Sequence, residues 1–210
     1  MAVVSNGTTL IDAGALGASA GAGKLTLIKT LTASSSSTLS FVHGASSVVF
    51  DGTYDSYIFK FIDIHPSADI SQFSFNMSVD GGSNYNVTKS TTSFRAYHSE
   101  DNAETGLAYF TSMDLAQSTS FQPLTYYSGI QNDASNVGTL QIFDPSDTTF
   151  VKHFICNTNE MSRDSGGNPP VSQNYFTAGY GNTTSAVNAI QFKFHSGNID
   201  AGTIKLYGVG

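Results

Sequence analysis

The sequence predicts an all-β protein: an antiparallel β-sandwich, jelly-roll-like, with an extended N-terminal arm. Segments such as 72–80 alternate strictly between large apolar and polar residues, which is the period of a strand with one buried face. Turn residues, mainly Gly, Asn, Asp and Ser, separate these segments, and almost no stretch has the helical period. Many short strands without helices are typical of a sandwich, and the jelly roll is a common form at 210 residues.

The chain divides into an arm, residues 1–23, and a single sandwich domain, residues 24–210. Residues 13–23 are nearly all Gly, Ala and Ser, which is too poor in side chains for a core and too rich in glycine for a stable helix. A few apolar residues of the arm are expected to lie on a neighbouring subunit, and a flexible linker is the alternative. The residues predicted to bind that partner are Val3, Val4, Leu10, Ile11 and Leu16.

Two strands dominate the first half of the sequence. Residues 57–64 are apolar on both faces, which predicts a central strand covered on both sides, and Pro66 ends it. Residues 72–80 follow after a short connection, and if the two strands pair through it they form an antiparallel ribbon. Alternation along the second strand predicts four core residues, which are Phe73, Phe75, Met77 and Val79.

The other expected strands are bounded by turn residues and breakers. They are 24–31, 38–43, 85–87, 93–98, 107–113, 123–130, 139–143, 149–157, 174–180, 190–195 and 203–207. Residues 114–118 are the only place where the sequence allows a helical turn.

Composition argues against several partners. Charged residues make up 12% of the chain, the net charge is −7, and the nine Lys and Arg are dispersed, whereas phosphate binding needs clustered cations. We therefore expect no nucleic-acid partner. No stretch approaches membrane-spanning length and no charged start precedes an apolar run, so we expect no membrane partner and folding in a cytoplasm. Cys156, the only cysteine, alternates with Phe154, which predicts a buried structural thiol.

No pattern marks a catalytic, cofactor-binding or metal site, so we expect neither an enzyme nor a cofactor. The five histidines have no second ligand at a metal-binding spacing, and no Gly-x-Ser-x-Gly nucleophile elbow occurs. Calcium prefers carboxylates in turns, but none here has the spacing of a hand-type loop. The turn carboxylates are Asp51, Asp55, Asp80, Asp101 and Glu104.

Five aromatic residues have three interpretations. They are Tyr126, Tyr127, Tyr175, Phe176 and Tyr180. Large apolar rings most often fill a core, but Tyr and Phe are also enriched at subunit interfaces and stack on sugar rings. We rank the core first, a subunit interface second and sugar binding third.

Four phrases of the sequence resemble a loosely defined group of tailed-bacteriophage virion proteins, in which a β-sandwich ends on Gly-Thr-Ile-Lys-Leu-Tyr-Gly. The phrases are Ala33–Phe41, Tyr54–Tyr57, Ser78–Tyr85 and Gly197–Gly208. The resemblance spans most of the chain from Leu25 onward, and its motifs are turns and strands rather than active-site residues. It implies a role in the virus particle and not a reaction.

Members of such groups serve as capsid decoration or cement proteins, or as tail, baseplate and fibre components. A single sandwich with an adhesive arm and no repetitive shaft favours decoration. The expected partner is then the major capsid protein, the expected oligomer is a homotrimer packed through strand faces, and the expected location is the capsid surface of the virion, assembled in the host cytoplasm. The alternative is a tail, baseplate or fibre-associated module that binds a receptor or a carbohydrate.

Overall fold

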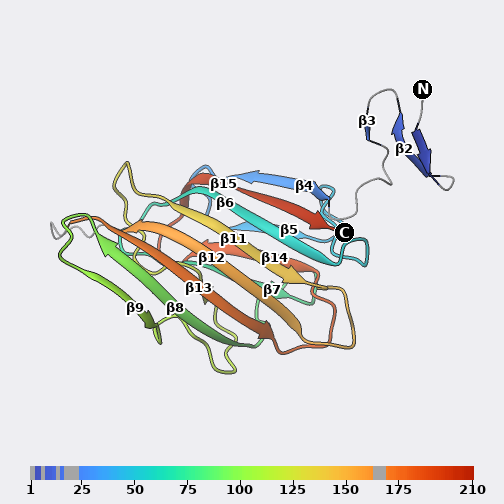
Figure 1. The fold of residues 1–210 in the computed structure, drawn as a ribbon. Coiled ribbons are helices and arrows are strands. Elements are labelled where there is room, and N and C mark those ends of the chain that lie inside the picture. Colours follow the sequence, from blue (N-terminus) through green and yellow to red (C-terminus); the bar gives the residue numbers. More distant parts are fainter. Residues whose placement is uncertain (1–2, 6–7, 13–14, 17–23, 163–168) are drawn as a thin grey trace.

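The computed structural model describes the backbone of residues 3–5, 8–12, 15–16, 24–162 and 169–210, and the side chains of residues 24–162 and 169–210. These residues contain strands and no helix, and hence no helix that could cross a membrane. Two antiparallel sheets pack face to face (Figure 1), which confirms the predicted all-β sandwich. The sandwich strands are β4 (Leu25–Thr32), β5 (Leu39–Val42), β6 (Ser56–Pro66), β7 (Phe73–Ser78), β8 (Lys89–Ser99), β9 (Thr105–Tyr109), β10 (Gln122–Pro123), β11 (Asn136–Phe143), β12 (Lys152–Ser162), β13 (Val171–Gly181), β14 (Ala189–Phe194) and β15 (Ile199–Val209).

The strand order is that of a jelly roll. The larger sheet has the order β4-β15-β6-β11-β12-β13-β8-β9, and the smaller has the order β10-β7-β14-β5. Pairings are nested, because the first sandwich strand, β4, pairs with the last, β15, while the second, β5, pairs with the second last, β14. Strands β6 and β7 then add to the two sheets in turn, followed by β11 and β10. Such alternation between two sheets is the jelly-roll topology.

Four added strands extend the larger sheet past the smaller one. Strands β8 and β9 are inserted between β7 and β10, and β12 and β13 between β11 and β14. Residues 110–131, which we call the covering segment, lie over the inner face of this extension. Within it, Leu115 N donates to Thr91 Oγ1 at 2.8 Å, and Thr91 Oγ1 donates to Gln122 Oε1 at 2.8 Å. Apart from β10, the edge strand of the smaller sheet, this segment is irregular, and it takes the place of a second sheet here.

Phenylalanine rings fill the space between the two sheets. Phe192 of β14 packs against the rings of five others, with centroid distances from 5.2 to 6.3 Å; they are Phe41, Phe59, Phe61, Phe73 and Phe75. All six side chains are buried. Aromatic pairs at such distances contribute about 0.5–1.5 kcal/mol beyond their buried area, so this cluster holds the sheets together. Cys156 is also buried in the core, as its alternation with Phe154 predicted.

The predicted ribbon of residues 57–64 and 72–80 is wrong in its pairing. The two strands exist as β6 and β7, but they belong to different sheets and face each other, with the rings of Phe61 and Phe73 5.2 Å apart. Alternation shows which side chains are buried but not which strand is the neighbour. The short connection between them crosses from one sheet to the other.

Burial of these two strands also differs from the prediction. The outer face of β6 is not covered, because Ile62 is 38% exposed, whereas both faces of β7 are buried, including Asn76. The Asn76 amide nitrogen donates to the carbonyl oxygens of Tyr85 and Thr119 at 2.7 and 2.9 Å, so loops cover this face. Val79 is 37% exposed, because β7 ends at Ser78 before reaching it.

Several short expected elements are irregular in the structure. Residues 85–87 and most of 123–130 are not strands, β9 ends before residue 110, and residues 114–118 contain no helical turn. Three of their apolar side chains, those of Val87, Met113 and Leu124, are nevertheless buried. Burial produced the apolar pattern at these three residues. Their backbone N–H groups donate to single backbone carbonyls, those of Met77, Phe110 and Phe73, and not to a continuous ladder.

The segment predicted as an arm contains three short strands, β1 (Val3–Ser5), β2 (Thr8–Asp12) and β3 (Ala15–Leu16). They form a separate antiparallel sheet in the order β1-β2-β3 and pair with no strand of the sandwich. The division at residue 24 stays a prediction.

Candidate functional site

The outer face of the larger sheet is the broadest surface of the sandwich. Side chains of its eight strands alternate, so that one half points into the core, as Phe59 and Phe154 do, and the other half forms what we call the outer face. An unusual number of these outward residues are large, apolar and exposed. They are Leu25, Leu27, Ile62, Phe94, Leu107, Tyr109, Val137 and Ile155.

One group of these residues gathers at the β9 edge, and we call it the β9 cluster: Phe94, Leu107, Tyr109 and Phe176. Phe94 on β8 lies directly opposite Tyr109 on β9 and Phe176 on β13. The rings of Phe94 and Phe176 stack with centroids 5.1 Å apart and an interplanar angle of 23°. Leu107 is 73% exposed, so its large apolar side chain is in contact with water beside the stacked rings.

Strand β9 is also an open edge of the sheet, because among the described residues no strand pairs with its outer side. Natural proteins protect open edges with charged residues, prolines or bulges. The sequence of β9, Thr-Gly-Leu-Ala-Tyr, has neither charge nor proline. Its free backbone groups and the β9 cluster together form a surface to which another strand can add.

A shallow hollow of about 560 Å³ lies further along the outer face, over β11, β12, β13 and β8. We call it the outer hollow. Its lining includes Phe143, His153, Ile155, Ala178 and Tyr180, and the rings of His153 and Tyr180 lie 6.0 Å apart. A hollow with mostly apolar walls can receive a protruding side chain of a partner.

The outer face carries positive charge in an acidic protein. Lys60 and Lys205 point outward from the neighbouring strands β6 and β15. Carboxylates in the eight strands are few: Asp63 and Asp200 lie towards one end of the sheet, and Glu160 is buried on the inner face. Although the chain has a net charge of −7, the other carboxylates of residues 24–162 and 169–210 lie outside these eight strands.

The predicted partner-binding residues fall elsewhere. The backbone of Val3, Val4, Leu10, Ile11 and Leu16 lies in β1, β2 and β3, but the side chains of these residues lie outside the described part of the chain. Their role in binding stays a prediction. The sequence predicted a homotrimer packed through strand faces, but it did not show which outward residues come together on the outer face. The available signal was the large apolar residue at such positions as Ile155.

The five aromatic residues separate into three environments. Tyr175 is fully buried on the inner face, so it has no contact with a ligand at the surface. Phe176 and Tyr180 belong to the outer face, in the β9 cluster and in the outer hollow. Tyr126 and Tyr127 pack edge to face in the covering segment, with ring centroids 4.4 Å apart. The core interpretation holds for Tyr175 and not for the whole set.

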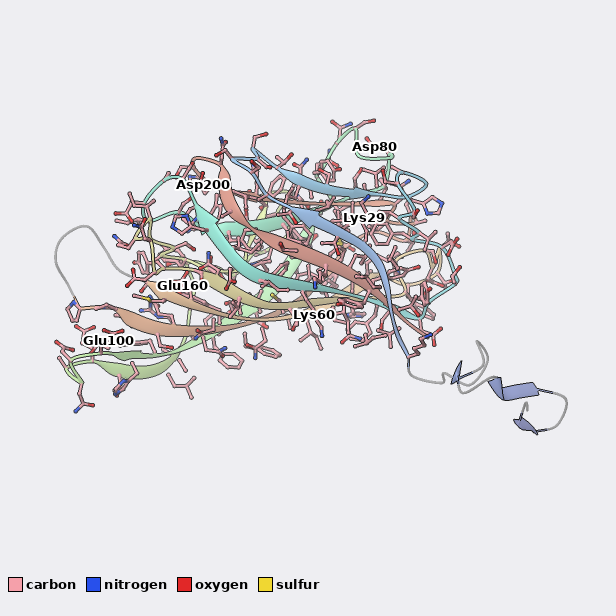
Figure 2. All side chains as sticks on the ribbon, turned by 90° about the horizontal axis from the view of Figure 1, so that it is seen from above. Lys29, Lys60, Asp80, Glu100, Glu160 and Asp200 are labelled. Carbon is pink, nitrogen blue, oxygen red and sulfur yellow. The ribbon has the colours of Figure 1, made fainter. Side chains whose placement is uncertain are left out.

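Acidic turns use their carboxylates to hold their own loops. Hydrogen bonds from the Ser78 hydroxyl and from Asn84 lower the pKa of Asp80 to about 2. Those from Ser99 and Ala103 lower the pKa of Asp101 in the same way. Figure 2 shows Asp80 and the loop of Glu100 at opposite ends of the body. Within residues 24–162 and 169–210, no three His, Cys, Asp or Glu side chains gather as metal ligands do.

Comparison with known proteins identifies no relative: no protein-family model and no curated protein matches the sequence, and no solved structure matches the fold.

Proposed function

We propose that this protein is a virion structural protein of a tailed bacteriophage, a capsid decoration protein that binds the major capsid protein on the outside of the shell and stabilises it. The supporting observation is the outer face, where exposed apolar side chains and two lysines form one broad and nearly carboxylate-free surface. Exposed apolar side chains gathered on one face of a protein mark a site of protein association. The sequence resemblance described above supports the phage origin.

The two parts of the outer face suit two kinds of contact. The outer hollow and the lysine pair lie away from the sheet edges, over strands that have a partner on each side, and we assign them to the shell. The β9 cluster lies at an open edge and is assigned to neighbouring copies of the chain, arranged as a homotrimer. In each contact, apolar side chains that are exposed in the isolated protein are then removed from water, which is favourable.

Copy number in the particle tests the proposed function. Quantitative mass spectrometry of purified virions from the phage that encodes this chain should return hundreds of copies, because a decoration protein repeats over the whole shell. A handful of copies would contradict decoration and favour a position in the tail.

Binding to particles stripped of this chain tests the assigned surface. Ile155→Glu places a charge in the outer hollow and should weaken co-sedimentation with the stripped shell at least about tenfold. Phe150→Glu is the matched control, because Phe150 is 71% exposed but lies in the loop between β11 and β12. Equal binding of both variants and the unchanged protein would reject the outer hollow as the contact.

A further inference from the structure

A second hollow lies on the opposite side of the extension, and we call it the end cleft. It encloses about 580 Å³ and is formed by the inner face of β8 and β13, the end of β12 and the covering segment. The residues that matter here are Arg95, Tyr97, Asp101, Glu104, Tyr127 and Gln173. None of them belongs to the outer face, so the end cleft is independent of the surface assigned to the shell.

The floor of the end cleft is polar and buried. Ser99, Ser162 and Gln173 line it, and their side chains are 2%, 6% and 4% exposed. Gln173 Nε2 donates to Ser162 Oγ at 2.7 Å, which fixes the orientation of the amide. Because burying polar groups is costly, a floor built from them indicates a site that orients a polar ligand.

A buried network holds this floor from below. Gln173 Oε1 lies 2.9 Å from the Tyr175 hydroxyl, and that hydroxyl lies 2.9 Å from Glu160 Oε1. The Glu160 carboxyl group also accepts from the Tyr127 N–H at 3.0 Å and from the Ser128 hydroxyl at 3.2 Å, so several neighbours hold it in place. Burial raises the pKa of Glu160, and these hydrogen bonds oppose that shift. The floor is therefore rigid before any ligand arrives.

Arg95 supplies the hydrogen-bond donors of the end cleft. Its Nη1 donates to Gln173 Oε1 at 2.9 Å, and its guanidinium lies over the rings of Phe110 and Tyr97, at 4.3 and 4.8 Å from their centroids. Among residues 24–162 and 169–210, no carboxylate forms an ion pair with it. A guanidinium has five N–H groups in a fixed plane, so Arg95 can bond Gln173 and a ligand at the same time.

Two tyrosines and two carboxylates complete the walls. Tyr127 is 40% exposed and offers a ring, while the Tyr97 ring leans over Gly106, where a Cβ would lie 2.7 Å from the ring. Asp101 is held by its loop, as described above, and Glu104 stands beside it. Donors, acceptors and aromatic rings thus face one space.

We propose that the end cleft is a binding site for a saccharide, such as a short stretch of a surface glycan. A sugar ring has an apolar face that stacks on tyrosine and adjacent hydroxyls that pair with planar groups such as guanidinium, amide and carboxylate. The polar floor disfavours an apolar ligand. The two carboxylates beside a single cation disfavour a phosphate. A neutral polyhydroxyl ligand satisfies donors and acceptors together.

Binding to an array of neutral oligosaccharides, followed by calorimetry with the best ligand, tests the proposal. We expect binding that weakens about tenfold, or ~1.4 kcal/mol, in Tyr127→Ala and in Arg95→Lys. Arg95→Lys keeps the charge but loses the planar fork. Phe150→Ala, which removes an exposed ring in the loop between β11 and β12, is the matched control and should bind as the unchanged protein does.

A second measurement does not depend on variants that fold. Amide chemical shifts of the unchanged protein, titrated with the same oligosaccharide, should move at Arg95, Asp101 and Tyr127 and stay still at the outer hollow. Shifts confined to the outer face would overturn the site. So would dissociation constants weaker than about 1 mM for every oligosaccharide of the array. Neither result bears on the copy number in the virion, which separates this proposal from the proposed function.

Discussion

Lys60 and Lys205 lie directly opposite each other on the neighbouring strands β6 and β15. Both side chains point to the outer face, and Lys60 Nζ lies 5.3 Å from the centroid of the Tyr207 ring on the same face. Like charges directly opposite in a sheet destabilise it by roughly 0.2–1 kcal/mol. This lysine pair lowers the stability of the sheet and contributes nothing to the core, which suggests that it binds a partner. We assign the pair to contact with an acidic patch on the shell.

Replacing Lys205 should therefore separate stability from binding. In Lys205→Gln, the repulsion disappears while the contact of Lys60 with Tyr207 remains, so the free energy of unfolding in urea should rise by about 0.2–1 kcal/mol. Co-sedimentation with stripped shells should weaken, more at low than at high salt. Lys24→Gln removes an exposed lysine just before β4 and serves as the control. A variant that loses stability and keeps its binding would refute the assignment.

The β9 cluster should determine oligomeric state. Leu107→Glu places a carboxylate on the open edge strand beside Phe94 and Tyr109, so a trimer built on this edge should dissociate. Sedimentation equilibrium should give a trimer mass for the unchanged protein and a monomer mass for the variant. The Phe150→Glu variant should stay trimeric. A monomer in every case would contradict the homotrimer.

Stability should depend on pH through Lys89. This side chain is buried, its Nζ donates to Asn76 Oδ1 at 2.5 Å and to Val87 O at 2.7 Å, and burial lowers its pKa from 10.5 to about 7. Between these values the unfolded chain binds a proton that the folded chain does not. The free energy of unfolding should consequently increase from pH 7 to pH 9, by up to about 1.4 kcal/mol per pH unit.

Lys89→Met, which cannot titrate, should flatten this rise in urea unfolding followed at several pH values. The measurement stops at pH 9. Burial raises the pKa of the Cys156 thiol, so at higher pH this thiol ionises in the unfolded chain before it does in the folded chain, which lowers the free energy of unfolding. An unchanged slope in the variant would mean that Lys89 is not the group responsible.

The phenylalanine cluster should dominate the unfolding energy. Phe192→Ala removes the ring that five others contact and should cost about 3–5 kcal/mol, or prevent folding. Phe150→Ala removes an exposed ring and should change the free energy of unfolding by less than about 0.5 kcal/mol. Thermal unfolding of the two variants side by side measures the difference.

Alternation in the sequence predicted the fold class and many strands, because a strand with one buried face carries its period locally. Strands β5, β14 and β15 follow it, and so does the buried Cys156. The pairing of β6 with β15 and β11 was not predictable in this way, since a side chain does not reveal which strand lies beside its own. The nested order of strand pairs is determined by the whole chain and not by the sequence of any one strand.

The candidate sites were harder to predict than the fold. The end cleft joins Arg95, Gln173 and Tyr127, which are far apart in sequence and meet only because β8 pairs with β13 and the covering segment lies across them. The outer face carried a local signal, apolar residues at outward positions, but a one-strand pattern does not say that neighbouring strands repeat it. Which apolar residues lie side by side on the outer face is set by the register between neighbouring strands.

Leu25 at the start of β4 lies opposite Val209 at the end of β15, a consequence of the outermost jelly-roll pair. The sandwich is therefore close to a closed circle of chain, which a linker of a few residues would complete. New ends opened in the loop between β11 and β12 would leave the strand pairings intact, so a circular permutant should fold. A peptide fused after residue 210 would emerge beside the beginning of the sandwich, which makes that corner the natural place to display a cargo.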